Sequence, residues 1–212
     1  MNQGIIFDMD GLMIDSERTI NKAVVRAGRE MGLADIENVS LRTIGLNNQS
    51  TRELYRSVYG EFDFDRLMDM KHKYIDEMIG DKGFPPKEGI GELLEYVTEK
   101  GYRVSVGSST REWAVREFLG KIGVLGYFDV LVCGDMGLRS KPHPDIFLAC
   151  AGKMGIAPRD CYVLEDSPNG IRAAYAAGMK AVMIPDMLAP DEEIKGMLYA
   201  LKASLTEAME LF

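Results

Sequence analysis

Apolar residues follow two different patterns along the chain, and the change between them divides it into two parts. Within residues 16–82 they recur at intervals of three and four, which is the spacing of amphipathic helices. This part of the sequence contains no convincing strand pattern. It predicts three helices, around residues 20–31, 50–59 and 64–78.

The segment that follows, residues 83–89, is rich in glycine and proline and is expected to be a loop. Beyond it, short apolar runs of strand length alternate with helical patterns. Strands are predicted at residues 102–106, 130–133, 161–164 and 181–184. Helices are predicted around residues 90–97, 115–122, 146–154 and 171–177, with a C-terminal helix across 194–209.

Strands that alternate with helices predict a parallel sheet with helices on both faces. The apolar run at residues 5–7 has the length of one more buried strand, and we assign it to the same sheet. The expected fold class is therefore α/β. A Rossmann-like parallel-sheet core is formed by residues 1–15 and 83–212, and an all-helical domain of residues 16–82 is inserted after the first strand.

Two carboxylates, Asp8 and Asp10, come directly after the first predicted strand, and Gly11 then allows the chain to turn. Two residues apart in an extended segment, their side chains leave the backbone on the same face. Their repulsion is relieved where a cation lies between them or where one of them keeps its proton. This segment is therefore a candidate metal or catalytic site. A solvated turn after a strand explains the same residues equally well.

Polar residues also follow the other predicted strands, and the carboxyl ends of parallel strands meet at one edge of the sheet. Ser108 and Ser109 precede a helix, where hydroxyl and N–H groups suit phosphate. Lys141 precedes a proline, which favours an extended backbone. Glu165 and Asp166 form a second acidic pair. Singly these are typical of helix starts and surface turns. Together they predict a site for Mg²⁺ and a phosphate group.

Composition narrows the function further. The net charge is −8, so the protein is a poor candidate for binding nucleic acid or an anionic membrane. No apolar run reaches the length of a membrane span. The three cysteines have no paired spacing, which is typical of reduced thiols in a cytoplasmic protein. We expect a monomer whose partner is a small phosphorylated metabolite.

Four motifs in this order resemble those of the haloacid dehalogenase superfamily. They are FDMDGLMIDSE from residue 7, VGSST from residue 106, SKPHPDIF from residue 140 and VLEDSPNGI from residue 163. The resemblance covers the whole chain. The helical insertion looks like the mobile cap of the subfamily that contains β-phosphoglucomutase and many sugar-phosphate phosphatases. It would act as a lid with hinges near residues 15 and 83.

The resemblance implies a mechanism. Asp8 would be the nucleophile and form an aspartyl-phosphate. Asp10 would protonate the leaving oxygen and then act as a base. Mg²⁺ would be held by the Asp8 carboxylate, the main-chain carbonyl of Asp10 and Asp166, with a direct or water-mediated contribution from Glu165.

The phosphoryl oxygens would be held by Ser108, the N–H group of Ser109 and Lys141, as in related phosphoryl transfers. We therefore expect a Mg²⁺-dependent phosphatase for a small phosphomonoester, either a sugar or a polyol phosphate. A β-phosphoglucomutase-like phosphotransferase is the alternative, and a catalytically silent phosphate-binding protein is a third.

Departures from the mutase pattern favour hydrolysis. Ile20 stands where the mutase has a histidine, and no arginine follows Gly45. Several cations of the helical segment could instead meet a substrate, although solvated helix faces account for any single one of them. They are Arg18, Arg42, Arg52, Lys71 and Lys73.

Overall fold

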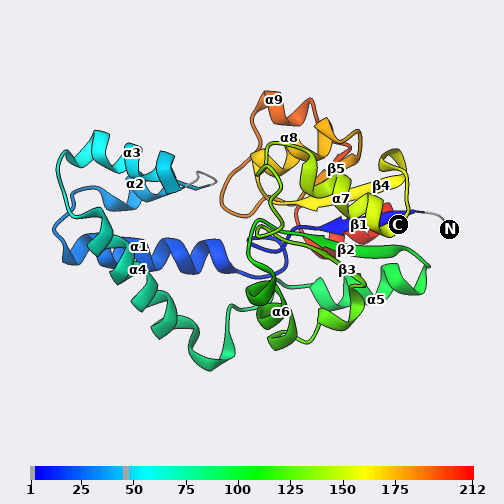
Figure 1. Cartoon of the computed structure of the whole chain (residues 1–212), viewed down its shortest axis with the longest axis horizontal. Helices are drawn as coiled ribbons and strands as arrows, with labels where there is room; N and C mark the ends of the chain where they lie inside the picture. Colours follow the sequence, from blue (N-terminus) through cyan, green and yellow to red (C-terminus); the bar gives the residue numbers. More distant parts are fainter. Residues whose placement is uncertain (1–2, 45–47) are drawn as a thin grey trace. The chain divides into compact units, whose positions relative to one another are not determined.

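The computed structural model describes residues 3–44 and 48–212, which form two compact units (Figure 1). The α/β unit consists of residues 1–15 and 85–212, and the helical unit of residues 16–84. Gly45 and the two residues after it lie outside the described residues. So do the side chains of residues 48–50.

A six-stranded parallel sheet forms the centre of the α/β unit, in the order β3-β2-β1-β4-β5-β6. The sequence prediction of a parallel sheet is confirmed, with one strand more than expected. The strands are β1 (Gly4–Phe7), β2 (Arg103–Gly107), β3 (Val130–Val132), β4 (Cys161–Glu165), β5 (Lys180–Met183) and β6 (Ala200–Leu201).

The first strand, β1, lies in the middle of the sheet and is buried along its whole length. Strands covered on both faces consist of continuous apolar runs, and this one does. Phe7 pairs with Val106 on one side and with Leu164 on the other. The residues that follow β1, β2 and β4 therefore leave the sheet side by side at its carboxyl edge.

Helices cover both faces of the sheet. On one face, α7 and α8 pack over alternate strand residues such as Ile6 and Val163. The residues between them, including Ile5 and Leu164, are also buried, so the opposite face is covered as well. The long helices are α5 (Ile90–Glu99), α6 (Glu112–Lys121), α7 (Asp145–Met154) and α8 (Pro168–Ala176).

The predicted C-terminal helix is wrong. Its place is taken by α9 (Glu192–Lys195), β6 and α10 (Leu205–Ala208). The backbone N–H of Tyr199 donates to the carbonyl of Ala181 at 2.8 Å, which brings β6 alongside β5. The free edge of β5 offers hydrogen bonds to the chain, and these override an apolar spacing that suits a helix.

The helical unit contains the three predicted helices and one that was not predicted. They are α1 (Ser16–Glu30), α2 (Ile36–Leu41), α3 (Asn48–Tyr59) and α4 (Phe64–Ile79), with α2 the addition. The unit has its own core, in which Tyr55 contacts the rings of Tyr59, Phe62 and Phe64. Because this core is separate from that of the sheet, the unit is compact by itself.

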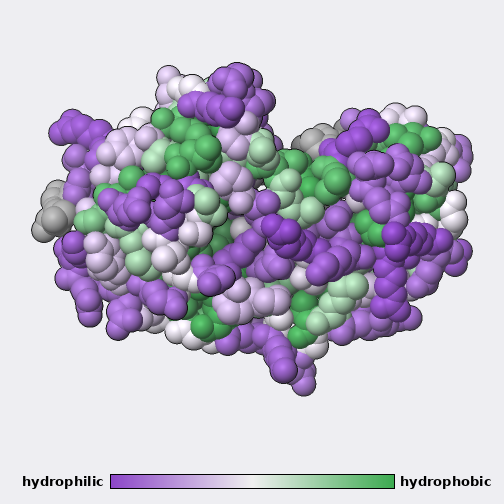
Figure 2. All heavy atoms as spheres, turned by 180° about the vertical axis from the view of Figure 1, so that it is seen from behind, coloured by the Kyte–Doolittle hydropathy of each residue, from purple (hydrophilic) through white to green (hydrophobic). Residues whose placement is uncertain are grey.

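Among the described residues, no helix is long and apolar enough to span a membrane. The face drawn in Figure 2 carries apolar residues in separate groups among mainly hydrophilic ones. All three cysteines are buried and unpaired.

Candidate active site

Asp8 is fixed by the sheet itself. Its N–H donates to the carbonyl of Leu164 at 3.0 Å, which continues the pairing of β1 with β4. Gly11 then turns the chain with a φ of 78°. A Cβ atom on Gly11 would lie 2.2 Å from Oδ2 of Asp166, so only glycine allows this close approach. The turn after β1 and the end of β4 thus bring the two acidic segments into contact.

Lys141 joins these segments electrostatically. Its Nζ lies 2.5 Å from Oδ1 of Asp8 and 2.7 Å from Oε1 of Glu165. The lysine side chain is only 9% exposed, and the Phe147 ring centroid lies 4.8 Å from Nζ. One ammonium group therefore serves two buried carboxylates. The Lys141–Pro142 peptide bond is cis.

Glu165 is held at both carboxylate oxygens. Oε1 accepts from Lys141, and Oε2 accepts from the N–H of Ser167 at 2.8 Å and from its hydroxyl at 2.9 Å. A Cβ atom on Gly170, in the first turn of α8, would lie 1.7 Å from Oε1 of Glu165. A glycine is therefore required at position 170 to make room for this carboxylate.

Burial is the largest single influence on the pKa of Asp8 and on the pKa of Lys141. It raises the pKa of Asp8 to about 8, with Lys141 opposing this effect and Glu165 and Asp10 adding to it. Burial alone would lower the pKa of Lys141, but Asp8 and Glu165 outweigh it and raise the pKa above the usual lysine value. The cluster thus has more carboxylates than its single cation can neutralise.

A divalent cation fits this imbalance. Asp8, Glu165 and Asp166 are all buried, and each offers an oxygen atom within 4.8 Å of the others. Carboxylate oxygens are the ligands that hard divalent cations prefer. Both oxygens of Glu165 are already engaged with Lys141 and Ser167.

The second half of the site follows β2. Ser108 is fully buried, and its Oγ accepts from the N–H of Thr110 at 3.0 Å. The hydroxyl of Thr110 donates to Oδ2 of Asp10 at 2.7 Å. Ser109 is exposed between them. The structure thus links the β2 loop to the second aspartate of the first motif.

Every predicted site residue therefore lies at the carboxyl edge of the sheet. Asp8, Lys141, Glu165 and Asp166 form one buried cluster, and Asp10 is attached to the β2 loop instead. Three supporting residues were not predicted as site residues: Ser167 and Gly170 accommodate Glu165 of the cluster, and Thr110 holds Asp10. A Ser-Pro pair that starts a helix signals the cap made by Ser167, but nothing local signals Thr110.

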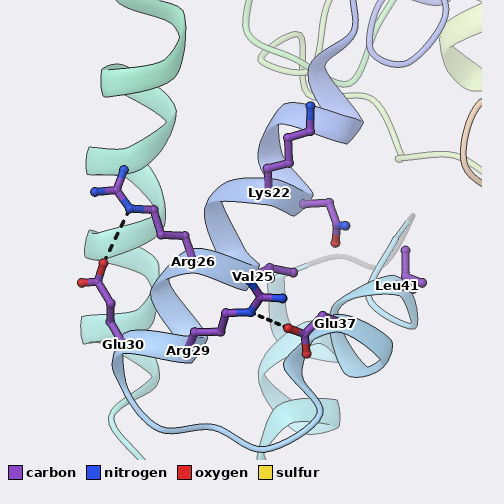
Figure 3. Close-up of a pocket in the computed structure, with 8 residues that line it drawn as sticks. Lys22, Val25, Arg26, Arg29, Glu30, Glu37 and Leu41 are labelled. Atoms are coloured by element: carbon purple, nitrogen blue, oxygen red, sulfur yellow. Dashed lines mark hydrogen bonds and ion pairs between the residues drawn. The ribbon is translucent and has the colours of Figure 1, made fainter.

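A hollow of about 530 Å³ in the described chain contains none of these residues. It lies within the helical unit, between α1 and α2 (Figure 3). Its arginines already have partners: Arg26 pairs with Glu30, and Arg29 with Glu37. A groove whose arginines are neutralised locally is a weak candidate for binding an anion.

A smaller hollow of about 180 Å³ in the same unit is chemically different. Its lining combines apolar side chains such as Ile20, Val24 and Met68 with one charge of each sign, Lys71 and Glu17. Burial lowers the pKa of Lys71, and no carboxylate among the described residues pairs with it. A half-buried lysine without an acidic partner is suited to an anionic or hydroxylated ligand.

A family model described as haloacid dehalogenase-like hydrolase matches residues 5–184, which include the whole cluster. The chain belongs to this family. The predicted resemblance is thus confirmed. One relative, fructose-1-phosphate phosphatase YqaB of Escherichia coli, is 34% identical over 84% of this chain and 94% of its own length. Hexitol phosphatase B of the same species is 30% identical over 85% of this chain and 82% of its own.

Solved structures agree on the fold. A family hydrolase from Deinococcus radiodurans with bound phosphate and sodium superposes with a TM-score of 0.81 at 23% identity, covering 97% of this chain and 93% of its own. β-Phosphoglucomutase from Clostridium difficile gives a TM-score of 0.73 at 21% identity, covering 97% and 92%. At such identities the likeness concerns the fold alone.

Proposed function

We propose that this chain is a Mg²⁺-dependent phosphatase that hydrolyses a small sugar or polyol phosphate through an aspartyl-phosphate. The observation that supports it most strongly is the buried cluster of Asp8, Lys141, Glu165 and Asp166 at the carboxyl edge of the sheet. The two curated relatives are phosphatases whose names specify fructose 1-phosphate and hexitol phosphates.

In the first step, an oxygen of Asp8 attacks phosphorus while the bond to the leaving alcohol breaks. Asp10 donates a proton to the departing oxygen. In the second step Asp10 takes a proton from the water that attacks phosphorus, the bond between phosphorus and the Asp8 oxygen breaks, and inorganic phosphate is released. Lys141 and Ser108 hold the phosphoryl oxygens as charge moves across them. Asp8, the carbonyl of Asp10 and Asp166 would hold Mg²⁺, which reduces the repulsion between the carboxylate and the phosphate.

Lys141 has a second task in this scheme. Its two contacts with Asp8 and Glu165 keep a positive charge beside the nucleophile before any phosphate arrives. Because the lysine is already desolvated, little reorganisation is needed when the phosphate binds. A surface lysine would lack this advantage.

The helical unit would act as a cap that selects the leaving group and excludes water during the reaction. Its hollow around Lys71 contains one cation, one carboxylate from Glu17, and both apolar and hydroxyl-bearing side chains. One cation suits a ligand with hydroxyl groups and a single phosphate better than a bisphosphate, whose second phosphate calls for paired cations. This favours water over a sugar phosphate as the acceptor. The buried thiols fit a cytoplasmic enzyme.

The decisive experiment measures phosphate release from a panel of phosphomonoesters with Mg²⁺, including fructose 1-phosphate and sorbitol 6-phosphate. Asp8→Asn protein is the matched control for contaminating phosphatases. We expect release from sugar or polyol phosphates by the wild type alone. Equal rates for wild type and variant would refute the proposal.

A second assay addresses the mutase alternative. β-Glucose 1-phosphate is supplied with a glucose bisphosphate primer, and both glucose 6-phosphate and free phosphate are followed. We expect hydrolysis to exceed isomerisation. Isomerisation that is ten times faster than hydrolysis, or more, would establish the phosphotransferase instead.

A further inference from the structure

The structure assigns a positioning role to Thr110: its hydroxyl orients the Asp10 carboxylate for proton transfer to the leaving group. This inference rests on the proposed function, since it concerns the acid of that reaction. Thr110 and Asp10 are 100 residues apart in sequence, and the hydroxyl donates to Oδ2 of Asp10 at 2.7 Å.

Three contacts hold the backbone around Thr110. Its N–H donates to Oγ of Ser108 at 3.0 Å, and its carbonyl accepts from the N–H of Gly134 at 2.9 Å. Further along both loops, the N–H of Glu112 donates to Oδ1 of Asp135 at 3.2 Å. The loop after β2 is thus tied to the loop after β3 at Thr110 and at Glu112.

The approach of these two loops is close. A Cβ atom on Gly134 would lie 1.9 Å from the carbonyl oxygen of Ser109, so position 134 accepts only glycine without a shift of the loop. Such packing leaves the Thr110 hydroxyl little freedom. A donor with a fixed position can fix the carboxylate that accepts from it.

Asp10 needs this support more than Asp8 does. Asp8 is buried and is held by Lys141, whereas Asp10 is only partly buried and carries no ion pair in the described structure. With Oδ2 engaged by Thr110, the other oxygen of Asp10 is presented in a defined direction. General acid catalysis depends on such geometry, because the proton must move along a short hydrogen bond.

The role has a kinetic signature. In the first step the bond between phosphorus and the leaving oxygen breaks, Asp8 gains the phosphoryl group, and a proton passes from Asp10 to the departing oxygen. A sugar alkoxide needs that proton. 4-Nitrophenolate is a stable anion and leaves without it. Loss of the correct orientation of Asp10 should therefore slow the hydrolysis of sugar phosphates and leave the hydrolysis of 4-nitrophenyl phosphate nearly unchanged.

The test compares Thr110→Val, which keeps the shape and removes the hydroxyl, with Thr110→Ser, which keeps the hydroxyl. For each protein kcat/KM is measured on fructose 1-phosphate, or on the sugar phosphate that the wild type hydrolyses fastest, and on 4-nitrophenyl phosphate. This ratio covers events up to the first irreversible step and so isolates departure of the leaving group.

We expect Thr110→Val to lose about tenfold on the sugar phosphate, a part of what a general acid contributes, and to stay within about twofold on 4-nitrophenyl phosphate. Thr110→Ser should keep most of the activity on both. The activated ester also reports that the valine variant has folded.

Two results would overturn the assignment. Equal losses on both esters would show that Thr110 shapes the phosphate site, and no loss on either would show that its hydrogen bond is idle. A wild type without activity on any ester in the presence of Mg²⁺ is a different failure, because it would remove the proposed function and this inference with it.

Discussion

Two lysines, the buried Lys141 in the α/β unit and the half-buried Lys71 in the helical unit, show how the two parts of this protein differ. Lys141 in the α/β unit lies between the carboxylates of Asp8 and Glu165, and they raise its pKa against the effect of burial. Lys71 in the helical unit lines a hollow, and burial alone lowers its pKa. The same desolvation acts on both lysines, but only one of them has a built-in counter-charge.

We infer from this difference that the α/β unit carries out the reaction and that the helical unit discriminates between ligands. A charge that the fold itself compensates is in place before the substrate arrives, as transition-state stabilisation requires. A charge without a partner gains one only from a ligand, so it suits discrimination between ligands. We therefore expect changes in the α/β unit to affect kcat most, and changes in the helical hollow to affect KM.

The strongest test of this division is Asp8→Asn. An amide is a poor nucleophile and a poor metal ligand, so we expect kcat to fall by a factor on the order of a thousand or more, as for other nucleophile replacements. Circular dichroism should remain that of the wild type. Asp129→Asn, which changes an exposed carboxylate of the same unit, is the control and should retain activity. Turnover by Asp8→Asn within a few-fold of wild type would exclude Asp8 as the nucleophile.

Removal of the metal should have a comparable effect. With excess chelator we expect activity to disappear, and added Mg²⁺ should restore it, because Asp8, Glu165 and Asp166 are three buried carboxylates with oxygens close to one another. Ca²⁺ should inhibit, since it takes more oxygen ligands at longer distances and can engage both oxygens of Asp8. Steady-state rates at a series of free metal concentrations provide the measurement. Full activity in chelator would contradict the metal site.

The two lysines themselves provide the most direct comparison. Lys141→Ala leaves the buried carboxylates of Asp8 and Glu165 without their cation, so we expect a loss of kcat on the order of a hundredfold or more. Lys71→Met should raise KM by about tenfold, the value of one charge-assisted hydrogen bond, and leave kcat nearly unchanged. A large fall of kcat in Lys71→Met, with KM unaltered, would break the division between the units.

Stability should depend on pH in the metal-free protein. The pKa of Asp8 is raised from 3.8 to about 8 by burial, so the folded state binds a proton more tightly than the unfolded state. The resulting stabilisation is complete below about pH 4 and is lost as the pH rises towards about 8. Mg²⁺ replaces that proton, so it should stabilise more at pH 8 than at pH 5.

Urea unfolding at several pH values, with chelator and with Mg²⁺, measures this effect. Asp8→Asn cannot lose a proton at this position and should show a flatter dependence in chelator. A metal-free wild type that became more stable between pH 5 and pH 8 would show that the Asp8 carboxyl is not desolvated as described.

The smallest effect is expected at Tyr55 in the helical core. Its hydroxyl is buried and lacks a hydrogen bond of good geometry in the described part of the chain: the Thr43 hydroxyl interacts with it but donates to the carbonyl of Ser40 at 2.6 Å. Tyr55→Phe removes a desolvated polar group, so the free energy of unfolding should rise by up to about 1 kcal/mol or stay constant. A loss of 2 kcal/mol or more, by the measure used for buried hydrogen bonds, would reveal a partner for this hydroxyl.

The sequence by itself determined five of the six strands described, most of the helices and the placement of the motif residues at one edge of the sheet. These features depend on local periodicity and on the rule that parallel strands end together. Asp8, Lys141 and Asp166 could therefore be assigned to one site although they are far apart in the chain. Each directly follows a predicted strand or lies in the loop beyond one, so its place needed no knowledge of side-chain packing.

Only the tertiary structure decided what holds these residues in place. The hydrogen bond from Thr110 to Asp10 joins two loops from neighbouring strands, and the space for Glu165 depends on Gly170. The chain end joined the sheet as β6 because the edge of β5 was available to pair with it. Such features arise from contacts between segments that are far apart in the sequence, so the local spacing of residues does not predict them.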